Sequence, residues 1–344
     1  MKDPTRRISR RLEPSRERVE DLLEEVEAFA NEPVVTCRRQ AMACAFDLQF
    51  AKSANHRVAL TSLEMIDDLE AQMTVYQDDS ELSEINAKAA ETPVVVEERL
   101  FELLARCRAL SLQTGGAFDI TSGPLIKAWG FYRREGHLPT PDELREARAR
   151  VGIDKVRFDP RAKTVRFTKP GIELNLGAIG KGYALDRVGE YLREQEFGAA
   201  LLSAGHSSLL ALGRPSWDVA WHVDLRDPRD LHRQLAMVRL RDQALSTSSA
   251  SQQYFDVDGK RYGHLIDPRT GWPTEGVLQV TVAAPDATLA EGLSTAFFIH
   301  GWEWTASYVK RHPELGVLMV LQEDPAKPAR VEVTGTIDVD MADA

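Results

Sequence analysis

The sequence predicts an α+β fold in which packed helices cover a mixed, largely antiparallel sheet. Three observations predict it. Short runs of alternating apolar and polar residues, such as AFDLQF (45–50), have the period of half-buried strands. Apolar residues at helical spacing mark longer segments, such as 54–72. Strands and helices mix along the chain without the strict alternation of a parallel α/β fold, which favours this class.

Residues 1–33 are expected to form a basic tail and an amphipathic helical extension outside the body. The first 12 residues are basic and polar with little to bury. Between Pro14 and Phe29, apolar residues at helical spacing are separated by acids. This start lacks the apolar core of a signal peptide and a lipobox cysteine. No run approaches the roughly 18 apolar residues of a transmembrane helix. We therefore expect a cytoplasmic protein with no integral membrane segment.

The composition excludes some classes of partner. The 344 residues are 43% hydrophobic and 28% charged, as in ordinary soluble domains, and carry a net charge of −10. This acidity disfavours binding to nucleic acid, so an anionic small substrate would need backbone N–H groups, a lysine or a metal. Cys37, Cys44 and Cys107 lack metal-ligand spacing and are expected to be buried thiols.

The body is expected over residues 34–338, followed by a disordered tail over 339–344. Helical periodicity predicts helices over 54–72, 97–113 and 141–150, the second of which ends where Thr-Gly-Gly suits a helix C-terminus. The runs KVRFD and TVRFT, joined by Pro-Arg-Ala-Lys, predict two short strands.

The second half of the chain predicts the elements that carry candidate chemistry. ELNLGAIGKGYALDRVGEYLREQ (173–195) indicates a strand, a glycine-rich turn and a helix, and AALLSAG after it indicates another strand. YFDVDGKRYGHLID (254–267) predicts a hairpin with His264 on its second strand, because Asp-Gly is a strong hairpin signal. LQVTVAAPD (278–286) predicts a strand, and TLAEGLSTAFFIHG (288–301) predicts a helix closed by glycine.

A glycine-rich turn and a polar helix face are the first candidates for chemistry. In Asn175–Tyr183 the turn leads into a helix N-terminus, whose N–H groups suit phosphate, although a tight structural turn fits the same residues. Glu291, Ser294 and Thr295 are spaced i, i+3, i+4 on one helix face, where carboxylate and hydroxyl oxygens suit Mg²⁺. A solvated helix face is the alternative, which the apolar residues around the three oppose.

Two further stretches combine turn residues with candidate binding groups. Asp267-Pro-Arg-Thr-Gly271 has the chemistry of a turn by itself, and it leaves His264 unexplained. A lone histidine fits a structural role as well as a catalytic one. In GAFDITSGPL (116–125), small residues near Trp129 and Phe131 would suit one wall of a pocket for a flat ring, or plain packing.

The order of these stretches resembles the ApbE family of FAD:protein FMN transferases. The resemblance rests on GAFDITSGPL, WGF, NLGAIGKGYALD, SAG, ALSTS, YGHLIDPRTGWP and VTVAAPDATLAEGLSTAFFIHG, taken in sequence. It runs from about residue 37 to 335 and implies a single compact ApbE-like domain. It also implies a Mg²⁺-dependent enzyme that cleaves the FAD pyrophosphate, passes FMN to a Thr or Ser hydroxyl of a target flavoprotein, and releases AMP.

The resemblance implies roles for individual residues. The metal ligands would be the Ala178 carbonyl, Glu291 and Thr295, with a contact from Ser294. The FAD pocket would be lined by Met42, Tyr76, Ala117, Phe118, Asp119, Asn175, Lys181 and Ile266. His264 would lie near the phosphates as a general base or a stabiliser of charge, and Asp267 would hold the loop or orient the histidine.

Four positions depart from the pattern of the family. Asn175 and Glu291 stand where the family usually has Asp, His206 where Gly is common, and Ser249 where Gly usually follows Thr-Ser. A lost charge, a longer ligand or an added side chain would each alter activity. Two alternatives therefore stay open: an FAD pyrophosphatase that releases FMN and AMP, and a catalytically silent FAD-binding or scaffold protein.

Overall fold

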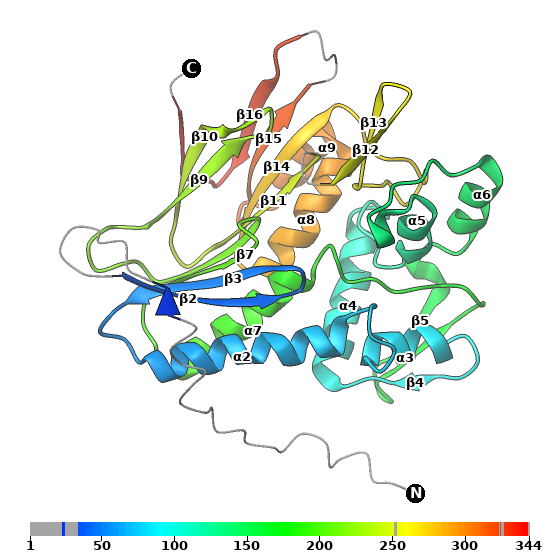
Figure 1. Cartoon of the computed structure of the whole chain (residues 1–344), viewed down its shortest axis with the longest axis horizontal. Coiled ribbons are helices and arrows are strands. Elements are labelled where there is room, and N and C mark those ends of the chain that lie inside the picture. The colour runs from blue at the N-terminus through cyan, green and yellow to red at the C-terminus, as the bar shows by residue number, and fades with distance from the viewer. Residues whose placement is uncertain (1–22, 25–33, 251–252, 323, 325–326, 343–344) are drawn as a thin grey trace, which may run out of the picture.

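A nine-stranded sheet forms the centre of the computed structural model, which describes residues 23–24, 34–250, 253–322, 324 and 327–342 (Figure 1). Within these residues the strand order is β1-β2-β3-β7-β8-β11-β14-β15-β16, and every neighbouring pair is antiparallel. The strands are β1 (Leu23–Glu24), β2 (Val34–Ala41), β3 (Cys44–Ala51), β7 (Ala200–Ala204), β8 (Ser208–Leu212), β11 (Ala244–Ser249), β14 (Val277–Ala284), β15 (Gly316–Leu321) and β16 (Arg330–Gly335). The predicted α+β class is confirmed.

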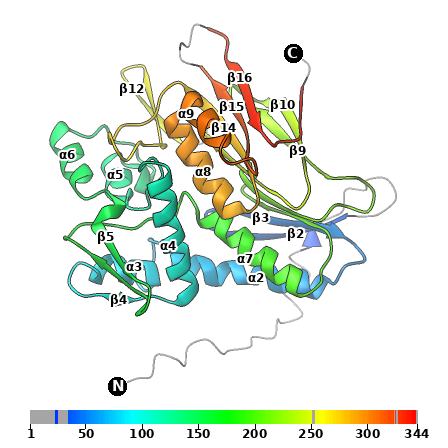
Figure 2. The same ribbon diagram turned by 180° about the vertical axis from the view of Figure 1, so that it is seen from behind.

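The two faces of this sheet bury different partners, because side chains alternate along each strand. One face, which includes Leu202 and Leu210, packs against helices in the larger core. The other face, with Leu201 and Leu209, packs against a small sheet in a second core. The small sheet contains β9 (Trp221–Asp227), β10 (Asp230–Leu240) and β17 (Val339–Met341). Figure 2 shows the helices and the small sheet on opposite sides of the large sheet.

Helices gather on the first face, where α7 and α8 lie directly against the strands (Figure 1). The helices are α2 (His56–Met73), α3 (Glu81–Lys88), α4 (Glu98–Gln113), α5 (Gly123–Ala128), α6 (Pro141–Ala149), α7 (Gly180–Glu194), α8 (Ala287–His300) and α9 (Trp302–Val309), with 3₁₀ turns at Phe131–Arg133 and Ile153–Lys155. The helices predicted within the body therefore form, and their ends differ from the predictions by one or two residues. Side-chain caps fix several starts, such as the Thr140–Glu143 capping box of α6.

A third, smaller core joins α5 and α6 to the predicted hairpin. It contains Trp129, Leu144 and Ile266. The hairpin pairs β12 (Tyr254–Val257) with β13 (Lys260–Gly263), and Asp258 and Gly259 have φ of 50° and 77°, as its tight turn requires. The predicted pair KVRFD and TVRFT also forms, in a sheet of β4 (Val94–Val95), β6 (Thr164–Phe167) and β5 (Val156–Asp159).

The structure corrects two expectations in the middle of the chain. Residues 173–176 form no strand, because their polar backbone groups bond elsewhere: Leu174 N–H donates to the Asn86 side chain and Asn175 N–H to the Ile120 carbonyl. His264 does not lie on the second strand of the hairpin, which ends one residue earlier at Gly263.

Two further corrections concern the ends of the chain. The expected disordered tail is wrong over Val339–Met341, which pair with β10 as strand β17. The expected amphipathic helix is wrong at Leu23–Glu24, which form the two-residue strand β1 beside β2. The rest of that predicted helix and the basic tail lie outside the described residues. Among the described helices, none has the length and apolar composition needed to cross a membrane.

Candidate functional site

The N-terminal turns of α7 and α8 meet at a junction that only a glycine permits. A Cβ built at Gly182 would lie 2.3 Å from the carbonyl oxygen of Ala287, which is far inside van der Waals contact. At this distance each helix caps the other. Glu291 Oε2 accepts the Gly182 N–H at 2.6 Å, while Asp186 accepts the Ala287 and Thr288 N–H groups at 2.8 Å each. Two helix starts are thus satisfied by carboxylates from the opposite helix.

The Glu291 carboxylate at this junction is buried and paired. Its side chain is 7% exposed, and its Oε1 lies 3.3 Å from Lys181 Nζ. Ser208 Oγ donates to the same oxygen at 3.3 Å, and Lys181 Nζ donates to Ser207 Oγ at 2.6 Å. The buried negative charge is therefore balanced by a lysine and by the positive end of α7.

Asp186, the other carboxylate at the junction, has a raised pKa. Burial raises it to about 6, while the hydrogen bond from Thr288 opposes the shift and the nearby Asp286 adds to it. Sequence reasoning assigned no role to Asp186, although it lies five residues after Lys181 in the glycine-rich motif. Its position on α7 gives no hint that its partner is a helix start about a hundred residues later.

The hydroxyl groups predicted as metal contacts differ in how they are used. Ser294 Oγ donates to the Glu291 carbonyl at 2.9 Å and lies 2.8 Å from Ser248 Oγ on β11. Thr295 is half-buried on the same helix face, and its hydroxyl makes no hydrogen bond to the described residues. The Ala178 carbonyl likewise accepts no hydrogen bond from the described part of the chain. Two oxygens, one just before α7 and one on α8, thus accept no hydrogen bond from the described residues.

These oxygens suit a hard cation such as Mg²⁺, which prefers carboxylate, carbonyl and hydroxyl ligands. No group of three or more His, Cys, Asp or Glu side chains within the described residues is placed to hold a metal by itself. A site here would therefore depend on one carboxylate and on ligands from the backbone and hydroxyls. The Ala178 carbonyl could take such a role, because no described group donates a hydrogen bond to it.

His264 directly follows β13 and is held by one backbone carbonyl. Its N–H and its ring Nδ1 each lie 3.1 Å from the Gln253 oxygen. Because a carbonyl only accepts, Nδ1 carries the proton of the neutral ring, which leaves the Nε2 lone pair free. Burial lowers the pKa of His264, and the positive charge of Lys181 lowers it further, against the hydrogen bond to Gln253. At neutral pH the ring is an uncharged base.

Asp267 holds the turn that follows His264. Its carboxylate accepts Arg269 Nε and Nη2 at 2.9 Å each, and Arg269 N–H at 2.9 Å. Its carbonyl accepts Gly271 N–H at 2.7 Å, and Gly271 has a left-handed φ of 81°. No hydrogen bond joins Asp267 to His264 in the described chain.

The residues predicted to line a flavin pocket fall into buried and exposed groups. Ala117, Phe118 and Ile266 are buried, whereas Tyr76 is 69% exposed and stacks on Tyr132 at 4.9 Å between ring centroids. Sequence reasoning did not single out Tyr132, whose hydroxyl donates to the Val75 carbonyl at 3.0 Å. It thereby holds Tyr76 with one face open to a flat ligand.

Met42 depends on a residue that sequence reasoning missed. It and Ala43 form the turn between β2 and β3 with φ of 49° and 58°, a conformation that costs free energy in residues other than glycine. The Met42 N–H donates to Glu70 Oε1 on α2 at 2.7 Å. Glu70 therefore stabilises the strained turn from an adjacent helix.

Two other predicted pocket residues use their side chains internally. Asp119 Oδ1 accepts the Thr121 N–H and hydroxyl, and Oδ2 accepts the Ile153 N–H at 2.9 Å. Burial raises the pKa of Asp119 although these hydrogen bonds oppose the shift. Asn175 Oδ1 accepts the Gly177 N–H at 2.8 Å. Both side chains shape loops in this structure.

The remaining departures from the family pattern lie in different environments. His206 is exposed with a left-handed φ of 56°, so its side chain occupies no buried space. Gly205 before it lies close to Cys44, since a Cβ there would be 3.0 Å from the Cys44 Cβ. Ser249 is buried, and its hydroxyl donates to the Leu278 carbonyl at 3.3 Å.

A cavity of about 380 Å³ borders the α7–α8 junction, and Asp186 and Thr288 are among its lining residues. It is lined by four arginines and four acids, together with apolar and neutral residues. Arg106 and Asp286 pair across it at 2.7 Å. No residue predicted for the flavin or metal site lines this cavity, so it does not mark the candidate site.

Comparisons with known proteins agree with the order of the motifs. The sequence profile of the ApbE family matches residues 42–319. The FAD:protein FMN transferase of Treponema pallidum is 32% identical over 274 residues, which cover 75% of this chain and 75% of that protein. The FAD:protein FMN transferase of Haemophilus influenzae is 32% identical over 268 residues, covering 76% and 77%.

Solved structures give the same result. The crystal structure of the ApbE protein of Thermotoga maritima aligns with a TM-score of 0.77 at 31% identity, covering 86% of this chain and 96% of that one. The flavin transferase ApbE of Vibrio cholerae aligns with a TM-score of 0.78 at 26% identity, covering 90% and 98%. Profile, relatives and structures together show that the chain belongs to the ApbE family.

Proposed function

We propose that this protein transfers FMN from FAD to a Thr or Ser hydroxyl of a target flavoprotein and releases AMP. Membership of the ApbE family and the names of its relatives support this reaction. The observation that carries the proposal is the α7–α8 junction, where a lysine, a buried carboxylate and a helix N-terminus meet near His264. Such a grouping combines positive charge for a pyrophosphate with a neutral base.

The metal proposed here is Mg²⁺, held by the Ala178 carbonyl, Glu291 and Thr295, with a contact from Ser294. The two oxygens that lack hydrogen-bond partners, on Ala178 and Thr295, support this set. Lys181 and Ser208 contact Oε1 of Glu291 and the Gly182 N–H bonds to Oε2, which leaves one lone pair of the carboxylate for a metal. When bound, Mg²⁺ would neutralise pyrophosphate charge and favour in-line displacement.

His264 is proposed to take the proton of the attacking hydroxyl on Nε2. The hydroxyl oxygen forms a bond to the phosphorus of the FMN half, and the bond from that phosphorus to the bridging oxygen breaks. The bridging oxygen leaves with AMP. Lys181, at the start of α7, is proposed to stabilise negative charge on the phosphates. The pKa of His264 is lowered from its ordinary value near 6.5. The rate should therefore not change with pH above 6.5, and it should decrease as the pH drops below that value.

The flavin pocket is proposed to lie between the segments that carry the remaining predicted residues. Tyr76 offers an exposed ring for stacking, and Phe118 and Ile266 offer buried apolar surface. Met42, Ala117, Asp119 and Asn175 are proposed to shape the walls of the pocket. Asp267 is proposed to act through the turn rather than on substrate, because Arg269 occupies its carboxylate.

The proposal is tested with purified protein, FAD and Mg²⁺, with and without a tagged acceptor domain that carries a Thr acceptor motif. AMP is followed by chromatography and acceptor flavin by in-gel fluorescence. We expect AMP and a fluorescent acceptor band, both lost with EDTA and with Thr295→Ala. Thr92→Ala, at an exposed threonine outside α8, is the matched control and should behave as the wild type.

The other outcomes select the alternatives. AMP release with FMN in solution, with the acceptor unlabelled, would identify an FAD pyrophosphatase. FAD binding without AMP would identify a catalytically silent FAD-binding protein, and the three contacts that Glu291 makes within the chain would then explain why it binds no metal.

A further inference from the structure

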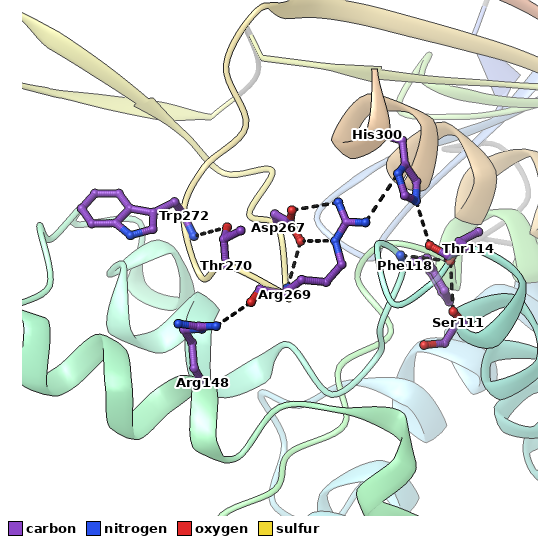
Figure 3. A network of polar contacts seen from close by, with 9 residues as sticks. All are labelled: Ser111, Thr114, Phe118, Arg148, Asp267, Arg269, Thr270, Trp272 and His300. Atoms are coloured by element: carbon purple, nitrogen blue, oxygen red, sulfur yellow. Dashed lines mark hydrogen bonds and ion pairs between the residues drawn. The ribbon is translucent and has the colours of Figure 1, made fainter. Parts of the chain in front are cut away.

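A network of polar contacts at the C-terminal end of α8 converges on His300 (Figure 3). His300 Nε2 lies 2.8 Å from the Thr114 carbonyl at the end of α4, and Nδ1 lies 3.5 Å from Arg269 Nη1. The His300 ring stacks on Trp304 of α9 at 3.8 Å between centroids with planes 5° apart. The ring is therefore fixed in its plane and bonded at both nitrogens.

Each polar partner of His300 belongs to a segment with a role in the proposed pocket. Thr114 Oγ1 accepts the Phe118 N–H at 3.3 Å, so this residue anchors the start of the 117–119 segment. Arg269 binds the carboxylate of Asp267 through Nε and Nη2, and Asp267 directly follows Ile266, which is proposed to line the pocket. Figure 3 shows Arg269 lying between Asp267 and His300.

The two segments also approach each other at Gly116. A Cβ at Gly116 would lie 3.7 Å from Arg269 Cγ, so the arginine stem runs along the backbone just before the 117–119 segment. The far side of the turn is held separately, since Arg148 donates to the Arg269 carbonyl at 2.7 Å and Trp129 Nε1 to the Gly271 carbonyl at 2.8 Å. His300 is thus the polar contact that joins the turn to the end of α4.

We propose that His300 is a positioning residue: by joining Thr114 to Arg269, it holds the 117–119 segment and the 266–269 turn at a fixed separation and so sets the affinity for FAD. This inference rests on the proposed function, because it assumes that both segments line the flavin pocket. It assigns His300 no contact with substrate.

The contacts require the neutral ring. Since the Thr114 carbonyl only accepts, Nε2 carries the proton, and Nδ1 accepts from the Arg269 guanidinium. The charged groups facing the ring are Arg269 and Asp267 from the turn, whereas α4 and α9 present the uncharged Thr114 and Trp304. Protonation of Nδ1 would place a second N–H against the guanidinium and break this contact. Burial lowers the pKa of His300, which keeps the ring neutral at pH 7.

The test compares FAD binding by wild type, His300→Phe and His312→Phe between pH 5.5 and 8, in EDTA so that FAD is not turned over. Phenylalanine keeps the stack on Trp304 and removes both polar contacts. His312 is the matched control, because it stacks on Tyr308 at 4.3 Å in the same manner and bonds to no part of the turn. Flavin fluorescence reports the dissociation constant.

We expect His300→Phe, which loses two polar contacts, to bind FAD at least about fivefold more weakly at pH 7.5, the factor that a single hydrogen bond contributes. The wild type should lose affinity as the pH falls through the pKa of His300, and this dependence should be absent from His300→Phe. In turnover with acceptor, KM for FAD should rise while kcat changes less than about twofold. His312→Phe should match the wild type.

Two results would overturn the inference by itself. One is wild-type affinity with unchanged pH dependence in His300→Phe. The other needs no ligand: NMR of ¹⁵N-histidine-labelled protein at pH 7.5 should show His300 protonated on Nε2, and a proton on Nδ1 would contradict the contacts. If the wild type binds no FAD in EDTA and releases no AMP in Mg²⁺, the proposed function falls and the inference falls with it.

Discussion

The α7–α8 junction and the 267–271 turn hold their polar groups in different ways. At the junction, the carboxylates of Glu291 and Asp186 are bonded to backbone N–H groups of rigid helices. In the turn, the backbone is held by the side chains of Arg148 and Trp129, and Asp267 by the half-exposed Arg269. The first arrangement tolerates almost no change in length, while the second depends on long side chains that can be exchanged.

This difference matches the different roles that we propose for the two regions. The groups proposed to handle phosphate charge must be placed to within a fraction of an ångström, and helix ends provide that placement. The segments proposed to face a flat ring need only a set separation. Substitutions at the junction should therefore reduce stability and rate together, whereas those at the turn should change affinity with little change in stability.

The largest effect is expected for Glu291→Gln. The amide removes the charge beside Lys181 and turns one acceptor at Gly182 or Ser208 into a donor. We expect a loss of about 2–3 kcal/mol in the free energy of unfolding and a rate lower by about 10²–10³-fold. Urea unfolding and AMP release measure the two. Glu190→Gln, exposed on α7, is the control and should change neither. If Glu291→Gln were as stable as the wild type, the proposed difference between the junction and the turn would be wrong.

Gly182→Ala is expected to have the next largest effect. Its Cβ would meet backbone atoms of Ala287 at 2.3 and 2.6 Å, so the helices must move apart. We expect about 2–3 kcal/mol of destabilisation by urea unfolding. Gly180→Ala is the matched control on the same helix, because a Cβ there meets nothing within 4 Å. The control should be unchanged or gain up to about 1 kcal/mol. Equal losses in both variants would mean that helix propensity, and not the close approach, sets the cost.

Asp186→Asn should change how stability depends on pH. The folded pKa of Asp186, about 6, lies above its unfolded value of 3.8, so folding binds a proton between these values. The contribution of this group is present below pH 3.8 and is lost as the pH rises through 6. Relative to the variant, the wild type should therefore gain about 1–2 kcal/mol from pH 7 to pH 4.5, discounted for partial exposure. Urea unfolding at both pH values measures it, and parallel curves would contradict the assignment.

The smallest effect is expected for Arg148→Met, which tests the other side of the comparison. The substitution keeps the aliphatic stem and removes an exposed hydrogen bond to the Arg269 carbonyl. Stability should fall by less than about 0.5 kcal/mol, and FAD affinity by about twofold. Thermal unfolding and flavin fluorescence measure these. A loss of stability as large as that of Gly182→Ala would remove the distinction between the two regions.

The parts of the fold that local chemistry determines were predicted from the sequence. The hairpin turn at Asp258-Gly259 and the helix over 288–301 form as expected, because turn preference and apolar period act over a few residues. The composition of residues 173–176 predicts a strand, but their backbone N–H groups bond to Asn86 and Ile120 instead of to a neighbouring strand. Strand β17 gave no local signal, since its partner β10 lies about a hundred residues earlier.

The candidate site was only partly predictable for the same reason. The spacing of Glu291, Ser294 and Thr295 predicted that they share one face of a helix, and helix α8 of the structure carries all three. Nothing in that spacing indicates that Gly182 and Lys181 meet the carboxylate. Tyr132 and Glu70 were missed because each acts through another residue, by stacking on Tyr76 or by bonding to the Met42 backbone.

The reciprocal caps of α7 and α8 have a consequence for how the protein folds. Their bonds join residues 109 and 101 positions apart, so neither helix start is complete until a long loop has closed. Docking of the two helices should therefore be a late step in folding. The Gly182 amide should exchange its hydrogen only through openings that separate the helices. A chain in which the two helices have not docked therefore lacks the proposed phosphate site altogether, because the site and this docking arise in the same event.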